Sequence, residues 1–79
     1  MSVNPDEYLV VGARSFGGAI REFRNRRHLT QQEVAERADI HRSYLAALEN
    51  GSATKALQQI MRAINTLGLE VVIRPKQPR

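Results

Sequence analysis

The chain has 79 residues, no cysteine, two histidines and a formal net charge of +4. A single small domain of this length buries only about 60% of its unfolded surface, so a partner or a ligand is expected to add stability. The absence of cysteine excludes disulfides and thiolate metal sites, and the positive charge favours nucleic acid as a partner.

The sequence also argues against an enzyme and against a membrane protein. No segment approaches the ~20 apolar residues that a membrane span needs, and no signal peptide is recognisable, which predicts a cytoplasmic protein. There is no phosphate-binding glycine loop, no pair of carboxylates in an apolar setting and no serine with a matched base. We therefore expect no enzymatic activity, no metal and no cofactor.

The first predicted helix follows an N-terminal extension, residues 1–14, which contains a short β-prone run at Tyr8–Val11. Ser15 is a suitable N-cap for this helix. Apolar residues then recur at helical spacing, at Phe16, Ala19, Ile20 and Phe23. The neighbouring Gly17 and Gly18 weaken a helix, which indicates that another part of the chain packs closely there.

Two further helices are predicted on either side of a tight turn at residues 38–41. The TQQE segment is a capping box, in which the Thr30 hydroxyl accepts a hydrogen bond from the Glu33 amide and the Glu33 side chain reaches back. This helix is expected to end near Asp39, and the one after it to run over residues 42–49. Two helices joined by so short a turn have the geometry of a helix-turn-helix, which places its second helix in the major groove of DNA.

A fourth helix and a strand complete the predicted elements. Thr54 is expected to cap this helix and Gly68 to end it. Its apolar stripe consists of Leu57, Ile60, Met61, Ile64 and Leu67. Residues 69–74 alternate along a β-strand, and a lone strand leaves backbone donors and acceptors unpaired. Pairing with the same strand of a second copy is favoured over pairing with Tyr8–Val11.

The stretch LTQQEVAERADIHRSYLAALENG, residues 29–51, resembles the XRE/Cro-C1 family of helix-turn-helix repressors. The resemblance extends over residues 20–69 and rests on IREFR, LTQ, EVA and LENG in that order. It implies an all-α, lambda-repressor-like domain of four to five helices at residues 15–68. A dimerisation strand at 69–74 and a flexible tail at 75–79 would follow.

The resemblance implies two sets of contacts with double-stranded DNA. The residues expected to meet base edges are Arg42, Ser43, Ala46 and Ala47. The residues expected to meet phosphates are Gln31, His41, Tyr44, Asn50, Thr54 and Lys55. For Tyr44, packing against the first helix is an equal alternative, and Asn50 could simply cap its helix. Members of the family usually carry a hydroxyl residue in place of His41, and imidazole is a poorer helix cap.

Two charged residues are assigned a structural role instead. The family counterparts of Arg24 and Glu49 pair with each other and tie the first helix to the end of the recognition helix. These two residues are therefore expected to form an ion pair and to make no contact with DNA.

The C-terminal stretch TLGLEVVIRP, residues 66–75, resembles that of HipB-type antitoxins, short XRE proteins whose partner is a HipA-type serine/threonine kinase toxin. It implies a homodimer on a palindromic operator that represses its own operon and neutralises the kinase. The dimerisation residues would be Leu69, Val71, Val72 and Ile73. Three alternatives stay open: a stand-alone small repressor, an XRE antitoxin of a ribonuclease toxin, and a module that binds only proteins.

Overall fold

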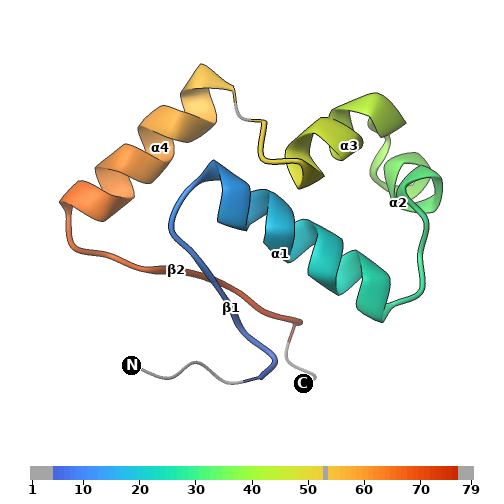
Figure 1. Ribbon diagram of the computed structural model, residues 1–79, viewed down its shortest axis with the longest axis horizontal. Coiled ribbons are helices and arrows are strands. Elements are labelled where there is room, and N and C mark those ends of the chain that lie inside the picture. Colours follow the sequence, from blue (N-terminus) through green and yellow to red (C-terminus); the bar gives the residue numbers. More distant parts are fainter. Residues whose placement is uncertain (1–4, 53, 77–79) are drawn as a thin grey trace.

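The computed structural model describes residues 5–52 and 54–76, which form four helices and a two-stranded sheet (Figure 1). The elements in chain order are β1 (Tyr8–Val10), α1 (Ala13–Arg26), α2 (Gln31–Ala38), α3 (Arg42–Glu49), α4 (Lys55–Thr66) and β2 (Val71–Ile73). The mostly helical helix-turn-helix fold predicted from the sequence is confirmed.

The two strands pair with each other and join the two ends of the domain. They run antiparallel, with Leu9 opposite Val72 and Val10 opposite Val71. The expected partner of the C-terminal strand is thereby corrected, because within the chain it pairs with β1 instead of lacking a partner. Pairing with a second copy would have to use another edge of this sheet, and it stays a prediction.

Strand β1 is fixed in place because its side chains complete the main core. Val10 is 2% exposed and packs with Ala19 of α1 and Met61 of α4. Partly buried side chains surround these three: Tyr8, Phe16, Leu57, Val71 and Ile73. The segment predicted as an N-terminal extension therefore supplies a core residue, and α1 lies between the sheet and the other helices (Figure 1).

Helix α1 begins three residues earlier than predicted. Gly12 is its N-cap, in extended backbone conformation, and Ser15 occupies the third helical position. The Ser15 hydroxyl accepts hydrogen bonds from the amides of Val11 (2.8 Å) and Gly12 (3.1 Å). The expectation that Ser15 is the N-cap is therefore wrong, although its hydroxyl does satisfy amides at this helix end.

Two glycines let α1 lie close to its neighbours. A Cβ at residue 17 would collide with the backbone carbonyl of Leu48, and one at residue 18 would lie 2.6 Å from the Tyr8 hydroxyl oxygen. Gly17 therefore brings α1 against the end of α3, and Gly18 brings it against β1. This close approach explains why a helix carries two adjacent residues of low helix propensity.

Helix α2 begins and ends as the sequence predicts. The Thr30 hydroxyl accepts from the Glu33 amide at 3.0 Å, and the Glu33 carboxylate accepts from the Thr30 amide at 2.8 Å. Asp39 ends α2 in the left-handed conformation, with φ of 57°.

Within residues 5–52 and 54–76, no helix is both long enough and apolar enough to cross a membrane.

Candidate nucleic-acid interface

Helix α3 has a buried side and a solvent-facing side. On the buried side, this helix contributes Leu45 and Glu49. None of the residues predicted to meet base edges is fully buried: Arg42, Ser43, Ala46 and Ala47. The first two are exposed and the two alanines are half-buried. Tyr44 is 49% exposed, so its ring is available to a partner.

The residues predicted to meet phosphates lie at the ends of helices. Gln31 is the first residue of α2, and His41 is the N-cap of α3 without a side-chain capping bond. Asn50 is the C-cap of α3. Thr54 caps α4 through its hydroxyl, which accepts from the Leu57 amide at 3.2 Å, and Lys55 follows as the first residue of that helix.

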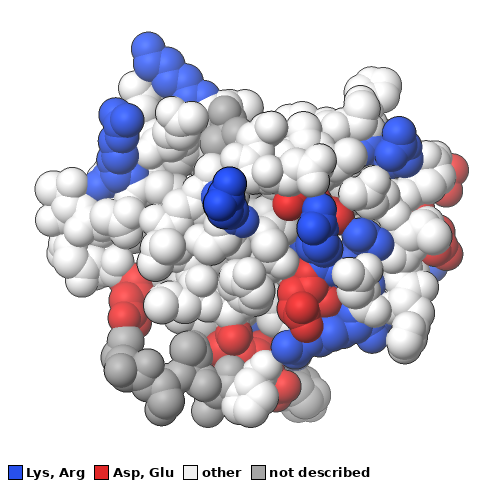
Figure 2. All heavy atoms as spheres, viewed as in Figure 1, with Lys and Arg blue, Asp and Glu red and all other residues white. Residues whose placement is uncertain are grey.

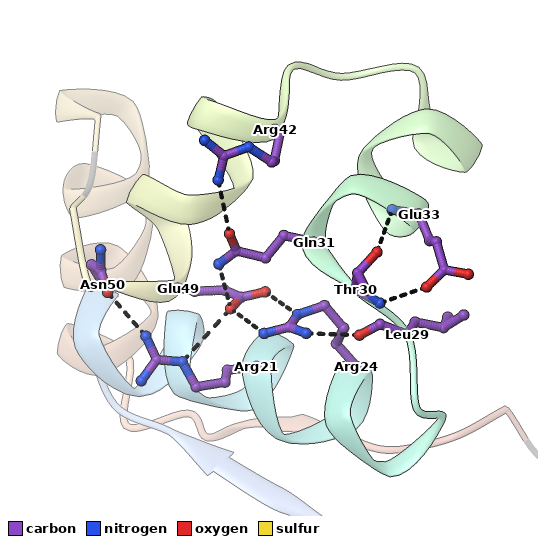
Figure 3. Close-up of polar contacts among 9 residues, drawn as sticks. All are labelled: Arg21, Arg24, Leu29, Thr30, Gln31, Glu33, Arg42, Glu49 and Asn50. Carbon is purple, nitrogen blue, oxygen red and sulfur yellow. Dashed lines mark hydrogen bonds and ion pairs between the residues drawn. The ribbon is translucent and has the colours of Figure 1, made fainter.

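A buried carboxylate connects helices α1, α2 and α3. The Glu49 side chain is 0% exposed and accepts hydrogen bonds from Arg24 Nε at 2.7 Å and Arg24 Nη2 at 2.9 Å (Figure 3). Arg24 also donates from Nη1 to the carbonyl of Leu29, just before α2, at 2.7 Å. The expected ion pair is thus present as a bidentate contact, and it ties α1 to α3 and to the start of α2.

The same carboxylate reaches the surface through Gln31. Gln31 Nε2 donates to Glu49 Oε1 at 3.0 Å, and Arg42 Nη1 donates to Gln31 Oε1 at 3.3 Å (Figure 3). One predicted phosphate contact and one predicted base contact are therefore joined to each other and to the buried ion pair. We call Glu49, Gln31 and Arg42 the relay.

The electrostatics of the ion pair favour the ionised form of both partners. Hydrogen bonding from Arg24 lowers the pKa of Glu49 against the opposing effect of burial, and Gln31 and the charges of Arg24 and Arg21 lower it further. The hydrogen bond to Glu49 correspondingly raises the pKa of Arg24. Glu49 is therefore a permanent anion at neutral pH, and it holds its donors in fixed directions.

Arg21 is a member of this site that the sequence pattern did not single out. Its Nε lies 3.6 Å from Glu49 Oε1, and its Nη2 donates to Asn50 Oδ1 at 2.9 Å (Figure 3). The available signal was its position three residues before Arg24, which places both guanidinium groups on one side of α1. Arg21 positions the Asn50 side chain at the end of α3.

On the face drawn in Figure 2, the positive charges do not form a single patch. Figure 2 shows Lys and Arg side chains spread across this face of the molecule, with acidic side chains at the edge where α2 lies, near the centre and along the lower part. No three acidic or histidine side chains form a candidate metal site among the residues described. The candidate interface is therefore defined by the helix ends and the relay.

Comparison with known proteins places this geometry in a family. A family model described as helix-turn-helix matches residues 20–73, more than half of the chain. An immunity repressor protein of Bacillus phage phi105 is 36% identical over 55 residues, which are 70% of this chain and 38% of the phage protein. No solved structure gives a significant match. These matches confirm the XRE-type resemblance, and the likeness to HipB-type antitoxins stays a prediction. The chain belongs to the helix-turn-helix family.

Proposed function

We propose that this protein is a DNA-binding transcriptional repressor that reads operator DNA with α3. The observation that carries the proposal is the relay, in which the first residues of α2 and α3 are joined and anchored to a buried ion pair. The family match and the similarity to a phage immunity repressor support the same function.

In the proposed complex, α3 enters the major groove with its exposed N-terminal residues toward the base edges. The Arg42 guanidinium can donate two hydrogen bonds to O6 and N7 of guanine, and the Ser43 hydroxyl can serve a base or a phosphate. Ala46 and Ala47 offer only methyl contacts, for example to thymine. Because this face carries few polar side chains, DNA shape supplies part of the specificity.

Phosphate contacts flank the recognition helix in the proposed complex. The amides at the N-terminus of α2 and the Gln31 side chain form one site, because a helix N-terminus favours an anion. His41 and Tyr44 lie near the start of α3. Asn50, Thr54 and Lys55 form a second site between α3 and α4, with Lys55 as a mobile point charge.

Titration of DNA with the purified protein tests this function. The probe is a fluorescent duplex of the DNA upstream of the protein's own coding region, and a shuffled duplex of equal composition is the control. Arg42→Ala should weaken binding to the upstream duplex by about 1–3 kcal/mol and reduce the preference over the shuffled duplex. Lys55→Ala should weaken binding to both duplexes to a similar extent. Equal, salt-independent affinity of wild type for both duplexes would contradict a repressor function.

We extend the proposal to a homodimer on a palindromic operator. Most large apolar side chains that remain exposed lie on the sheet, just after β1, on α4 and on the loop between α4 and β2: Leu9, Val11, Ile60, Leu67, Leu69 and Val72. Among the described strands, β2 pairs only with β1 and leaves its opposite edge open. An open edge beside exposed apolar surface favours association with a second copy.

The predicted dimerisation residues divide by orientation. Val71 and Ile73 are half-buried against the core, whereas Leu69 and Val72 are 56% and 39% exposed. An antiparallel ribbon of two β2 strands centred on Val72 would place Glu70 of one copy opposite Arg74 of the other. Opposite charges across such a pair stabilise it. The inward residues would then supply backbone contacts, and the outward residues apolar ones.

A narrower role within this function is that of a HipB-type antitoxin of a HipA-type kinase toxin. The support for it is the likeness of residues 66–75 to the C-terminal strand of that group. Affinity purification from the native host separates the possibilities. A serine/threonine kinase recovered with the protein favours the antitoxin, a ribonuclease favours the other class of antitoxin, and a homodimer on DNA without a toxin favours a stand-alone repressor.

A further inference from the structure

A hollow with two arginines in its lining lies beside the end of the recognition helix. Its volume is about 580 Å³, and it opens between the first half of α1, strand β1 and the end of α3. Its charged lining residues are Arg14, Arg21 and Glu49. The charge of Glu49 is fully buried and already paired with Arg24, so the hollow presents two guanidinium groups to solvent.

Both arginines are available to a ligand. Arg14 is exposed, and it takes part in no ion pair among residues 5–52 and 54–76. The Arg21 side chain is 50% exposed and uses only part of its donor set, on Glu49 and Asn50. The first turn of α1, which borders the hollow, has no acidic residue, so the positive end of the helix dipole adds to the same field.

The hollow is continuous with the proposed DNA-binding surface. Arg21 Nη2 lies 2.9 Å from Asn50 Oδ1 at the C-terminal end of α3 (Figure 3). Arg14 lies directly against Gly51, where an added Cβ would be 3.3 Å from the Arg14 Cα. A DNA strand that contacts Asn50 would therefore pass the two arginines next.

We propose that Arg14 and Arg21 bind a phosphate of the DNA backbone beside the end of α3, so that α1 contributes to the interface. This inference rests on the proposed function. Guanidinium groups bind phosphate through paired N–H donors, and their contribution to affinity depends on salt concentration. Arg21 has a second role, because its bond to Asn50 orients the amide beside the same strand.

The salt dependence of DNA binding tests the inference. The probe is a mixed-sequence 24-base-pair duplex, because binding to phosphate needs no specific operator. The slope of the logarithm of affinity against the logarithm of salt concentration is compared for wild type, Arg14→Ala and Arg21→Ala. We expect the magnitude of the slope to fall by about 0.9 for each phosphate that a protomer no longer neutralises.

Arg27→Ala is the matched control. Arg27 caps the opposite end of α1, about 20 Å from Arg14 along the helix at 1.5 Å per residue, and it carries the same charge. Its removal should leave the slope unchanged. Thermal unfolding confirms that each variant is folded, and Arg14→Ala decides the outcome if the loss of Arg21 destabilises the domain. An unchanged slope for Arg14→Ala in a protein that binds DNA overturns this inference alone. If the wild type binds neither this duplex nor the upstream duplex, the inference and the proposed function are both overturned.

Discussion

At the scale of the residue, Glu49 is the one buried charged residue among those described. Its carboxylate is fully buried and accepts from Arg24 and Gln31, so its removal leaves the Arg24 charge, only 14% exposed, without compensation. We expect Glu49→Ala to lower the free energy of unfolding by about 3–5 kcal/mol, measured by urea denaturation. Glu22→Ala is the control, because Glu22 pairs with Arg26 at the surface, and its loss should cost less than about 1 kcal/mol.

The same residue gives the domain a defined sensitivity to acid. The hydrogen bonds from Arg24 hold the folded-state pKa of Glu49 below its ordinary value of 4.5. Its stabilisation is therefore complete above pH 4.5 and is lost as the pH falls through the folded-state pKa. The stability difference between wild type and Glu49→Gln should be constant near neutral pH and should shrink as the pH falls below 4.5. A difference that does not change between pH 7 and pH 2.5 would contradict this assignment.

At the scale of the element, the contact between α1 and α3 depends on the absence of a side chain at residue 17. Alanine there raises helix propensity, but its Cβ would meet the backbone carbonyl of Leu48, which has no flexible end to move aside. We expect Gly17→Ala to destabilise the domain by about 1–3 kcal/mol. Asn25→Ala, at an exposed position of the same helix, should be neutral or slightly stabilising. A more stable Gly17→Ala variant would show that α1 can shift away from α3.

Signals from neighbouring residues were sufficient to predict most helices. They were insufficient to predict which strands and side chains pair with each other. The capping box at Thr30 and the left-handed Asp39 depend on neighbouring residues, so the sequence predicts them correctly. The pair of Arg24 and Glu49 could be anticipated only through the family resemblance. Strand β1 could not be assigned, because three residues carry little pattern and its pairing is decided by the burial of Val10. Contacts between residues far apart in the sequence, such as Arg21 with Asn50, follow only from the packing of helices.

At the scale of the whole molecule, the proposed DNA interface needs two things: a DNA-binding surface within each chain, and a fixed distance between two copies. The relay at the helix-turn-helix is assembled within one chain, because its members belong to helices that the buried ion pair holds together. A palindromic operator needs a second copy at a fixed distance, with half-sites about 34–36 Å apart. Nothing in the relay supplies that distance. In our proposal it is set at the opposite side of the domain, by the open edge of β2.

The dimer can therefore be disrupted without touching the DNA-binding helices. In a ribbon centred on Val72, the two copies of this residue face each other at about 4.5–5.5 Å between Cβ atoms, where like charges repel. Val72 is 39% exposed, so we expect the isolated chain to tolerate aspartate there. We expect Val72→Asp to sediment as a monomer with a largely unchanged melting temperature and to lose affinity for a two-half-site operator. Val72→Thr, which keeps the β-branched shape, should remain a dimer. A dimeric Val72→Asp protein with undiminished operator affinity would place the dimer contact elsewhere, and the apolar end of α4 around Leu67 would then be the surface to alter next.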